Sequence, residues 1–119
     1  MEVLFIVLND LNYLDDIFAK FVELEVRGAT ILDSKGMARA IMDNEGLNFL
    51  LSGPFQRSLD EEQKNSKTIF TVIPEAKKVE EVVNAVRKIV EASKKQVIGF
   101  MFTIPVSGIY PMKPKNLKI

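Results

Sequence analysis

The run VLFIVL, residues 3–8, contains only Val, Leu, Ile and Phe, and it ends at Asn9 and Asp10. An unbroken apolar run of this length, rich in β-branched and aromatic residues, is typical of a β-strand. A second run of the same kind, VIGFMFTI, covers residues 97–104. Because polar residues do not alternate with apolar ones in either run, both predict strands that are shielded from water on both faces.

Two segments repeat apolar residues with the spacing of an amphipathic helix. In the first, Asn12 is the expected N-cap and Arg27-Gly28 the expected end. The second begins at Val79 and carries its charged residues on the opposite side. The apolar positions are Leu14, Ile17, Phe18 and Phe21 in the first helix and Val82, Val83, Val86, Ile89 and Val90 in the second.

Residues 28–34 and 68–73 contain Thr and Ile in short runs that predict two further strands, the later one ended by Pro74. The order is then strand, helix, strand, strand, helix, strand. Right-handed crossovers give an α+β, ferredoxin-like βαββαβ sandwich, with an antiparallel sheet, two helices on one face and a long loop between strands two and three. We expect a single domain over residues 1–106, a long loop over 36–66 and a C-terminal tail over 107–119.

This architecture leaves one face of the sheet without helices. In the first strand both Leu4-Ile6-Leu8 and Val3-Phe5-Val7 are apolar, so either face would expose large side chains. Each such side chain left in water forgoes about 1.5–3 kcal/mol. A second copy of the chain is the simplest cover for that face, and the sequence therefore predicts a homo-oligomer.

Composition excludes several classes of function. The chain has 119 residues, 16 basic and 16 acidic, with no Cys and no His. A balanced charge disfavours nucleic acid as a partner, and the missing residue types exclude thiolate and imidazole chemistry and most zinc sites. We expect a cytoplasmic protein, since neither a signal peptide nor a membrane span is recognisable.

The long loop is unusually apolar. Met37, Ala38, Ile41 and Met42 have helical spacing, several large apolar residues follow, and only residues 57–66, RSLDEEQKNS, have the polar composition of a flexible segment. Two interpretations stay open: the apolar half packs on its own assembly, or it forms a docking patch for a partner. The candidate partner-binding residues are Ile41, Met42, Phe49, Leu50 and Phe55.

Several features together resemble the P-II signal-transduction superfamily. They are Arg27-Gly28 with Thr30, Lys35-Gly36 with Arg39, the register of residues 68–90, and the ending GFMFTIPV over residues 99–106. The resemblance implies a trimer whose sheets face inward, adenine nucleotides bound in the clefts between subunits, and a long loop that engages partner proteins.

Carried over position by position, the resemblance implies a ligand site. Thr30, Gly36 and Met37 would approach the base, Arg39 would stand near the entrance, and Gly99 would end the phosphate loop. Residues 93–98, SKKQVI, depart from the family because they contain no Gly. Lys94 and Lys95 could supply point charges to the ligand, or they complement the C-terminal dipole of the preceding helix.

The long loop also lacks the tyrosine that some family members carry, since Tyr13 and Tyr110 lie outside it. No nucleotide-binding GxGxxG or GxxxxGK[ST] motif occurs, and the acidic clusters, Asp43 with Glu45 among them, are expected to be solvated. The resulting hypothesis is a non-enzymatic, trimeric P-II-like sensor of ATP, ADP or AMP with a membrane transporter or an enzyme as partner. The alternative is a CutA-like trimeric structural module that binds no nucleotide.

Overall fold

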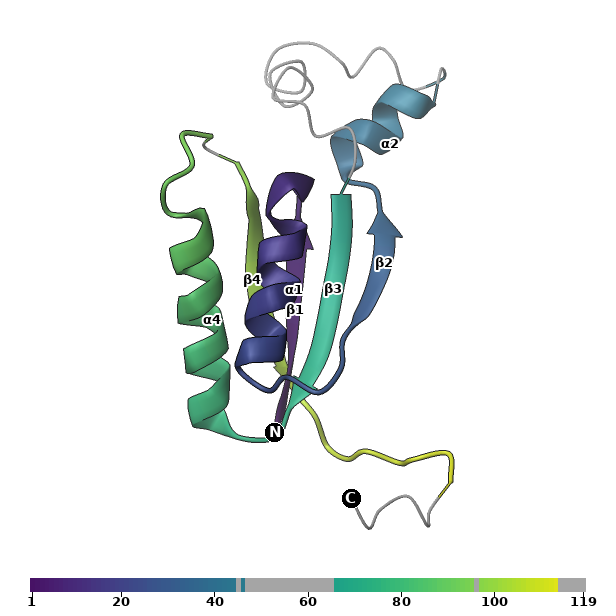
Figure 1. Ribbon diagram of the computed structural model, residues 1–119. Helices are drawn as coiled ribbons and strands as arrows, with labels where there is room; N and C mark the ends of the chain where they lie inside the picture. The colour runs from purple at the N-terminus through teal and green to yellow at the C-terminus, as the bar shows by residue number, and fades with distance from the viewer. Residues whose placement is uncertain (45, 47–65, 96, 114–119) are drawn as a thin grey trace.

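The computed structural model describes residues 1–44, 46, 66–95 and 97–113 (Figure 1). Its elements follow in the expected order, and the antiparallel sheet has the strand order β2-β3-β1-β4. This is the ferredoxin-like α+β fold predicted from the sequence. The elements are β1 (Glu2–Leu8), the short 3-10 helix η1 (Leu11–Tyr13), α1 (Leu14–Glu23), β2 (Thr30–Ser34), α2 (Met37–Asp43), β3 (Ser66–Ile73), α4 (Ala76–Val90) and β4 (Gly99–Pro105).

The core lies between one face of the sheet and the two long helices, α1 and α4, which cover that face side by side (Figure 1). One set of β1 side chains, Leu4, Ile6 and Leu8, points into it and is fully buried. The other buried members are Ile69 and Ile73 of β3, Ile17 and Phe21 of α1, and Val79, Val82 and Val86 of α4. The helical spacing predicted from the sequence therefore identifies the core-facing sides of both helices.

The opposite face of the sheet carries no helix and is apolar across its strands. Phe5 of β1 lies opposite Phe70 of β3 and Phe102 of β4, and the Phe5 and Phe102 rings stack with centroids 4.8 Å apart. Around this row the exposed apolar side chains on the same face are Val72, Phe100, Phe102, Ile104 and Leu32. In the single chain Phe100, Phe102 and Ile104 of β4 are exposed on this face, so shielding of both faces of β1 and β4 from water stays a prediction.

The start of the first helix differs from the prediction. Asp10, not Asn12, is the capping residue: its Oδ1 accepts a hydrogen bond from the Asn12 backbone N–H at 3.1 Å and begins η1, which leads directly into α1. The first residue of α1 follows Tyr13, whose side chain makes no capping hydrogen bond. Asp10 lies two residues before the predicted cap, Asn12. Asp and Asn are both good N-caps, because the side-chain oxygen of either residue can accept a hydrogen bond from an unpaired backbone N–H of the first turn.

The end of the first helix also differs. The helix ends at Glu23, before the predicted end at Arg27-Gly28, and Glu25, with φ 61°, adopts the left-handed conformation. The Glu25 N–H donates to the Val22 carbonyl at 3.1 Å and the Val26 N–H donates to the Phe21 carbonyl at 2.8 Å. This pair of bonds is a Schellman motif, in which the left-handed position is normally Gly.

Strand boundaries shift by one or two residues. β2 begins at Thr30, two residues after Gly28, and β4 begins at Gly99 instead of residue 97. Gly99 has φ +152°, and a Cβ added there would lie 2.0 Å from the Val7 carbonyl oxygen. Only glycine can start β4 so close to the β1 backbone.

Candidate ligand-binding site

The first group of predicted ligand residues surrounds the start of α2, at the end of the β2 edge strand. Gly36 is the N-cap of α2 in an extended conformation, Met37 is exposed, and Arg39 lies one turn before Asp43. Ile41 is buried with 5% of its surface exposed, and Met42 is partly buried. The other candidate partner-binding residues, Phe49, Leu50 and Phe55, lie outside the described residues.

Two cations hold the Asp43 carboxylate at the end of α2. Lys35 Nζ lies 2.7 Å from one carboxylate oxygen, and Arg39 Nε lies 3.2 Å from the other. The hydrogen bond from Lys35, with the positive charge of Arg39, lowers the pKa of Asp43 below its ordinary value. Asp43 is exposed to solvent, as expected. The sequence analysis did not predict its ion pairs, because Lys35, eight residues earlier, meets Asp43 across the turn from β2 into α2.

The strands below α2 are joined by side chains. Ser34 and Ser66 hydroxyl oxygens are 2.8 Å apart, and Ser66 also donates to the Ser34 carbonyl at 2.8 Å. Beside them Lys67 Nζ donates to Asp33 at 2.6 Å. These contacts fix both ends of the long β2–β3 connection at one place on the sheet.

The second group of predicted ligand residues lies at the β4 edge. Lys94 is exposed, whereas Lys95 Nζ lies 3.3 Å from Asp10, whose side chain is only 8% exposed. The basic residues in the last turn of α4 are Arg87 and Lys88. The ion pair of Lys95 with Asp10 therefore connects the α4–β4 segment to the N-cap of η1. Arg87 and Lys88, which lie in the last turn of α4, are better placed to complement its helix dipole.

The two groups lie at the same end of the sheet but at opposite edges. Gly99 pairs with Leu8 of β1, Leu8 pairs with Lys67 of β3, and Lys67 pairs with Asp33 of β2. With strands about 4.8 Å apart, the edges are about 14 Å from each other. Thr30 pairs with Phe70 in the middle of the sheet, away from both groups. Within a single chain the two groups of predicted ligand residues are therefore separated by the width of the sheet.

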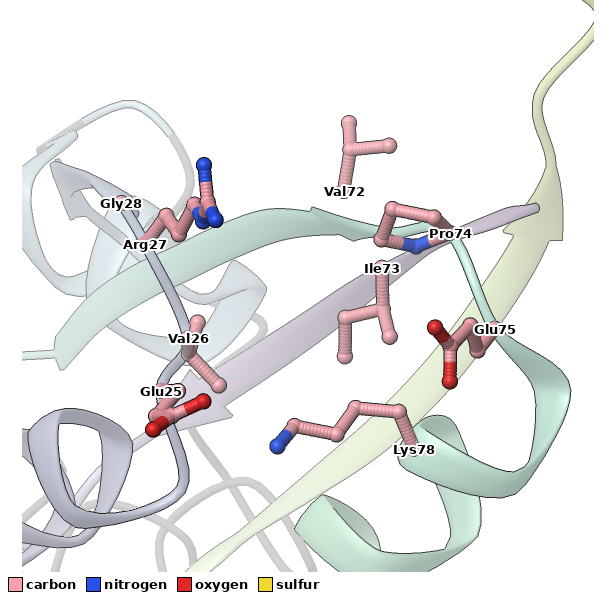
Figure 2. A pocket seen from close by; sticks show the side chains of 9 residues that line it. All are labelled: Glu25, Val26, Arg27, Gly28, Val72, Ile73, Pro74, Glu75 and Lys78. Atoms are coloured by element: carbon pink, nitrogen blue, oxygen red, sulfur yellow. The ribbon is translucent and has the colours of Figure 1, made fainter. Parts of the chain in front are cut away.

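A cavity that the sequence analysis missed lies at the other end of the sheet. It has a volume of about 540 Å³ and opens where the α1–β2 and β3–α4 connections meet (Figure 2). Thr71, buried in β3, donates its hydroxyl to the Gly28 carbonyl and holds the first connection against the sheet. The lining residues are Glu25, Val26, Arg27, Gly28, Val72, Ile73, Pro74, Glu75 and Lys78.

The described residues contain no cluster of three or more acidic side chains that could hold a metal ion. Within the same part of the chain, no helix is both long enough and apolar enough to span a bilayer.

Comparison with known families identifies the class of protein. The family model described as "Nitrogen regulatory protein P-II" matches residues 1–116. Because the match covers nearly the whole chain, this protein belongs to the P-II family. A comparison with curated proteins found no match.

P-II proteins are regulatory proteins and not enzymes, and they commonly bind adenine nucleotides. The chain is therefore a P-II-like regulatory protein, and the CutA-like structural alternative is not favoured.

Proposed function

We propose that this P-II-like protein is a cytoplasmic homotrimer that binds an adenine nucleotide (ATP, ADP or AMP) between its subunits. It reports the bound state to a protein partner, a membrane transporter or an enzyme, through residues 36–66. In this proposal the protein itself catalyses no reaction, and any chemistry is performed by the partner.

The helix-free face supports assembly. It is apolar on β1 and β4 and carries Phe70 and Val72 of β3 and Leu32 of β2, and several of these Phe, Val, Leu and Ile side chains are exposed in the single chain. Contiguous apolar surface of this kind marks interaction sites on soluble proteins. A second copy presents the same surface, so the sheets of neighbouring chains can cover each other.

The ion pairs of Asp43 carry the ligand half of the proposal. Lys35 and Arg39 already hold one anion, 2.7 and 3.2 Å from the Asp43 oxygens. A nucleotide phosphate offers the same cations more charge and more acceptor oxygens, and Arg can bind it with two donors. Thr30, Gly36 and Met37 of one subunit and Lys94, Lys95 and Gly99 of its neighbour complete the proposed cleft.

The same contact couples the ligand to the partner segment. Asp43 is the last residue of α2, which begins the long connection (Figure 1). A phosphate that pairs with Lys35 and Arg39 breaks their ion pairs with Asp43 and so releases the end of α2. The chain then has two states, one with Asp43 paired and one with Asp43 released, and the ligand shifts the equilibrium between them by the difference in its affinity for the two states. Ile41 and Met42, with Phe49, Leu50 and Phe55, are the proposed partner contacts.

Titration calorimetry of the purified protein with ATP, ADP and AMP tests the ligand half. We expect saturable heat with one site per chain, and loss of at least about tenfold in affinity in Arg39→Ala, because the guanidinium contact is charge-assisted. Lys77→Ala, on the exposed side of α4, is the matched control and should bind normally. The absence of heat and of any thermal shift with all three nucleotides overturns the proposal.

A further inference from the structure

We infer that Asp10 competes with the nucleotide for Lys95, so that the contact between these two side chains sets the nucleotide concentration at which the cleft fills. The inference rests on the proposed function, in which Lys95 is one of the ligand contacts. It adds to that site a residue that neither the sequence pattern nor the family resemblance indicated. In the single chain Lys95 Nζ lies 3.3 Å from Oδ2 of Asp10.

The Asp10 carboxylate is largely enclosed by the protein. Its side chain is only 8% exposed, and burial of a carboxylate is costly unless hydrogen bonds and a cation satisfy it. Oδ1 accepts a hydrogen bond from the Asn12 backbone N–H at 3.1 Å, and Oδ2 is the oxygen that pairs with Lys95. Asp10 therefore retains Lys95 more strongly than an acid on the open surface would.

Backbone hydrogen bonds fix Asp10 beside the α4–β4 connection. The N–H groups of Asn9 and Asp10 both donate to the Ile98 carbonyl, at 2.7 and 3.3 Å. Within the connection, the Lys95 N–H donates to the Ser93 hydroxyl at 3.2 Å. Because the main chain is held on both sides of the ion pair, Lys95 can leave Asp10 by rotating its side chain alone.

The Lys95 side chain is able to change partner. It is 55% exposed, and a lysine ammonium on its flexible stem acts as a point charge that can turn toward another anion. A phosphate offers it more charge and more acceptor oxygens than one carboxylate does. The apparent affinity for the nucleotide is then reduced by the fraction of chains in which Asp10 still holds Lys95.

Titration calorimetry of full-length Asp10→Asn with ATP and ADP tests the inference. Asn keeps the N-cap, since Asn and Asp are about equally good caps, but it removes the charge that holds Lys95. We expect the dissociation constants to fall about three- to tenfold, and the thermal midpoint to fall less than in Asp10→Ala. Asp15→Asn removes an exposed acid from the first turn of α1. It is the control for net charge and should bind both nucleotides as the wild type does.

A double-mutant cycle separates competition from a general effect on the fold. Lys95→Met should weaken ATP binding, and combining it with Asp10→Asn should give no further gain, because the competing pair is already absent. An equal gain from Asp10→Asn with and without Lys95 overturns the inference. Measurable ATP binding that is equal or weaker in Asp10→Asn than in the wild type also overturns it and leaves the proposed function intact. If neither protein binds any nucleotide, the proposed function and the inference fail together.

Discussion

Phe100 offers the most direct test of assembly through the helix-free face. Its side chain is 60% exposed in the single chain and stacks on Phe102, with ring centroids 6.0 Å apart. Full burial of a Phe side chain contributes about 1.5–3 kcal/mol, so covering the exposed part contributes about 1–2 kcal/mol per subunit. Across three subunits the loss in Phe100→Glu is about 3–5 kcal/mol, or a factor of about 10² to 10⁴ in the association constant.

Sedimentation velocity measures the outcome. We expect the wild-type chain of 13.4 kDa to sediment as a trimer of about 40 kDa, and Phe100→Glu to sediment as a monomer with unchanged far-ultraviolet circular dichroism. Val22→Glu is the matched control, since Val22 is 78% exposed on α1 and lies on the helical side. A wild-type protein that is monomeric at micromolar concentration, or a Phe100→Glu variant that remains trimeric, would refute the reasoning.

Three further predictions concern single side chains. Gly99→Ala should lower the free energy of unfolding by about 1–3 kcal/mol through backbone strain, measured by urea denaturation, while Gly28→Ala, which has open space at its Cβ, should change it little. Asp10→Ala should cost about 0.5–2 kcal/mol through loss of the cap, measured by thermal unfolding, and an Asp15→Ala variant that matches it contradicts the capping role. Asp43→Asn should raise nucleotide affinity in calorimetry because Lys35 and Arg39 are released; an unchanged affinity contradicts competition. In the wild type the lowered pKa of Asp43 means that its ion pairs stabilise the fold above the usual pKa of 3.8 and are lost as the pH falls below it, which a carboxyl NMR titration would follow.

The sequence predicts the fold well because hydrophobic periodicity is local. The apolar runs at β1 and β4 and the spacing in α1 and α4 each depend on neighbouring residues, and all four elements form where they were predicted. The end of α1 was misjudged because Gly28 is the better left-handed residue by propensity, whereas Glu25 adopts that conformation in the structure.

The sites were less predictable because they depend on contacts distant in sequence. The i, i+4 spacing of Arg39 and Asp43 on α2 could have indicated their ion pair, but the approach of Lys35 depends on the turn between β2 and α2. The cavity was missed for the same reason, since Glu25 and Lys78 belong to connections some fifty residues apart. The one available signal was an acidic residue just after a helix.

The placement of the proposed nucleotide residues at opposite edges of the sheet has a consequence for regulation. Each chain can give one half-site to each of two neighbours, so a closed ring contains as many complete sites as chains. In the proposed trimer, occupancy would depend on protein concentration as well as on nucleotide concentration, because a ligand that bridges two chains draws the oligomer together by mass action. Dilution alone would empty the clefts, and the cell's level of this protein would itself set the threshold of the response.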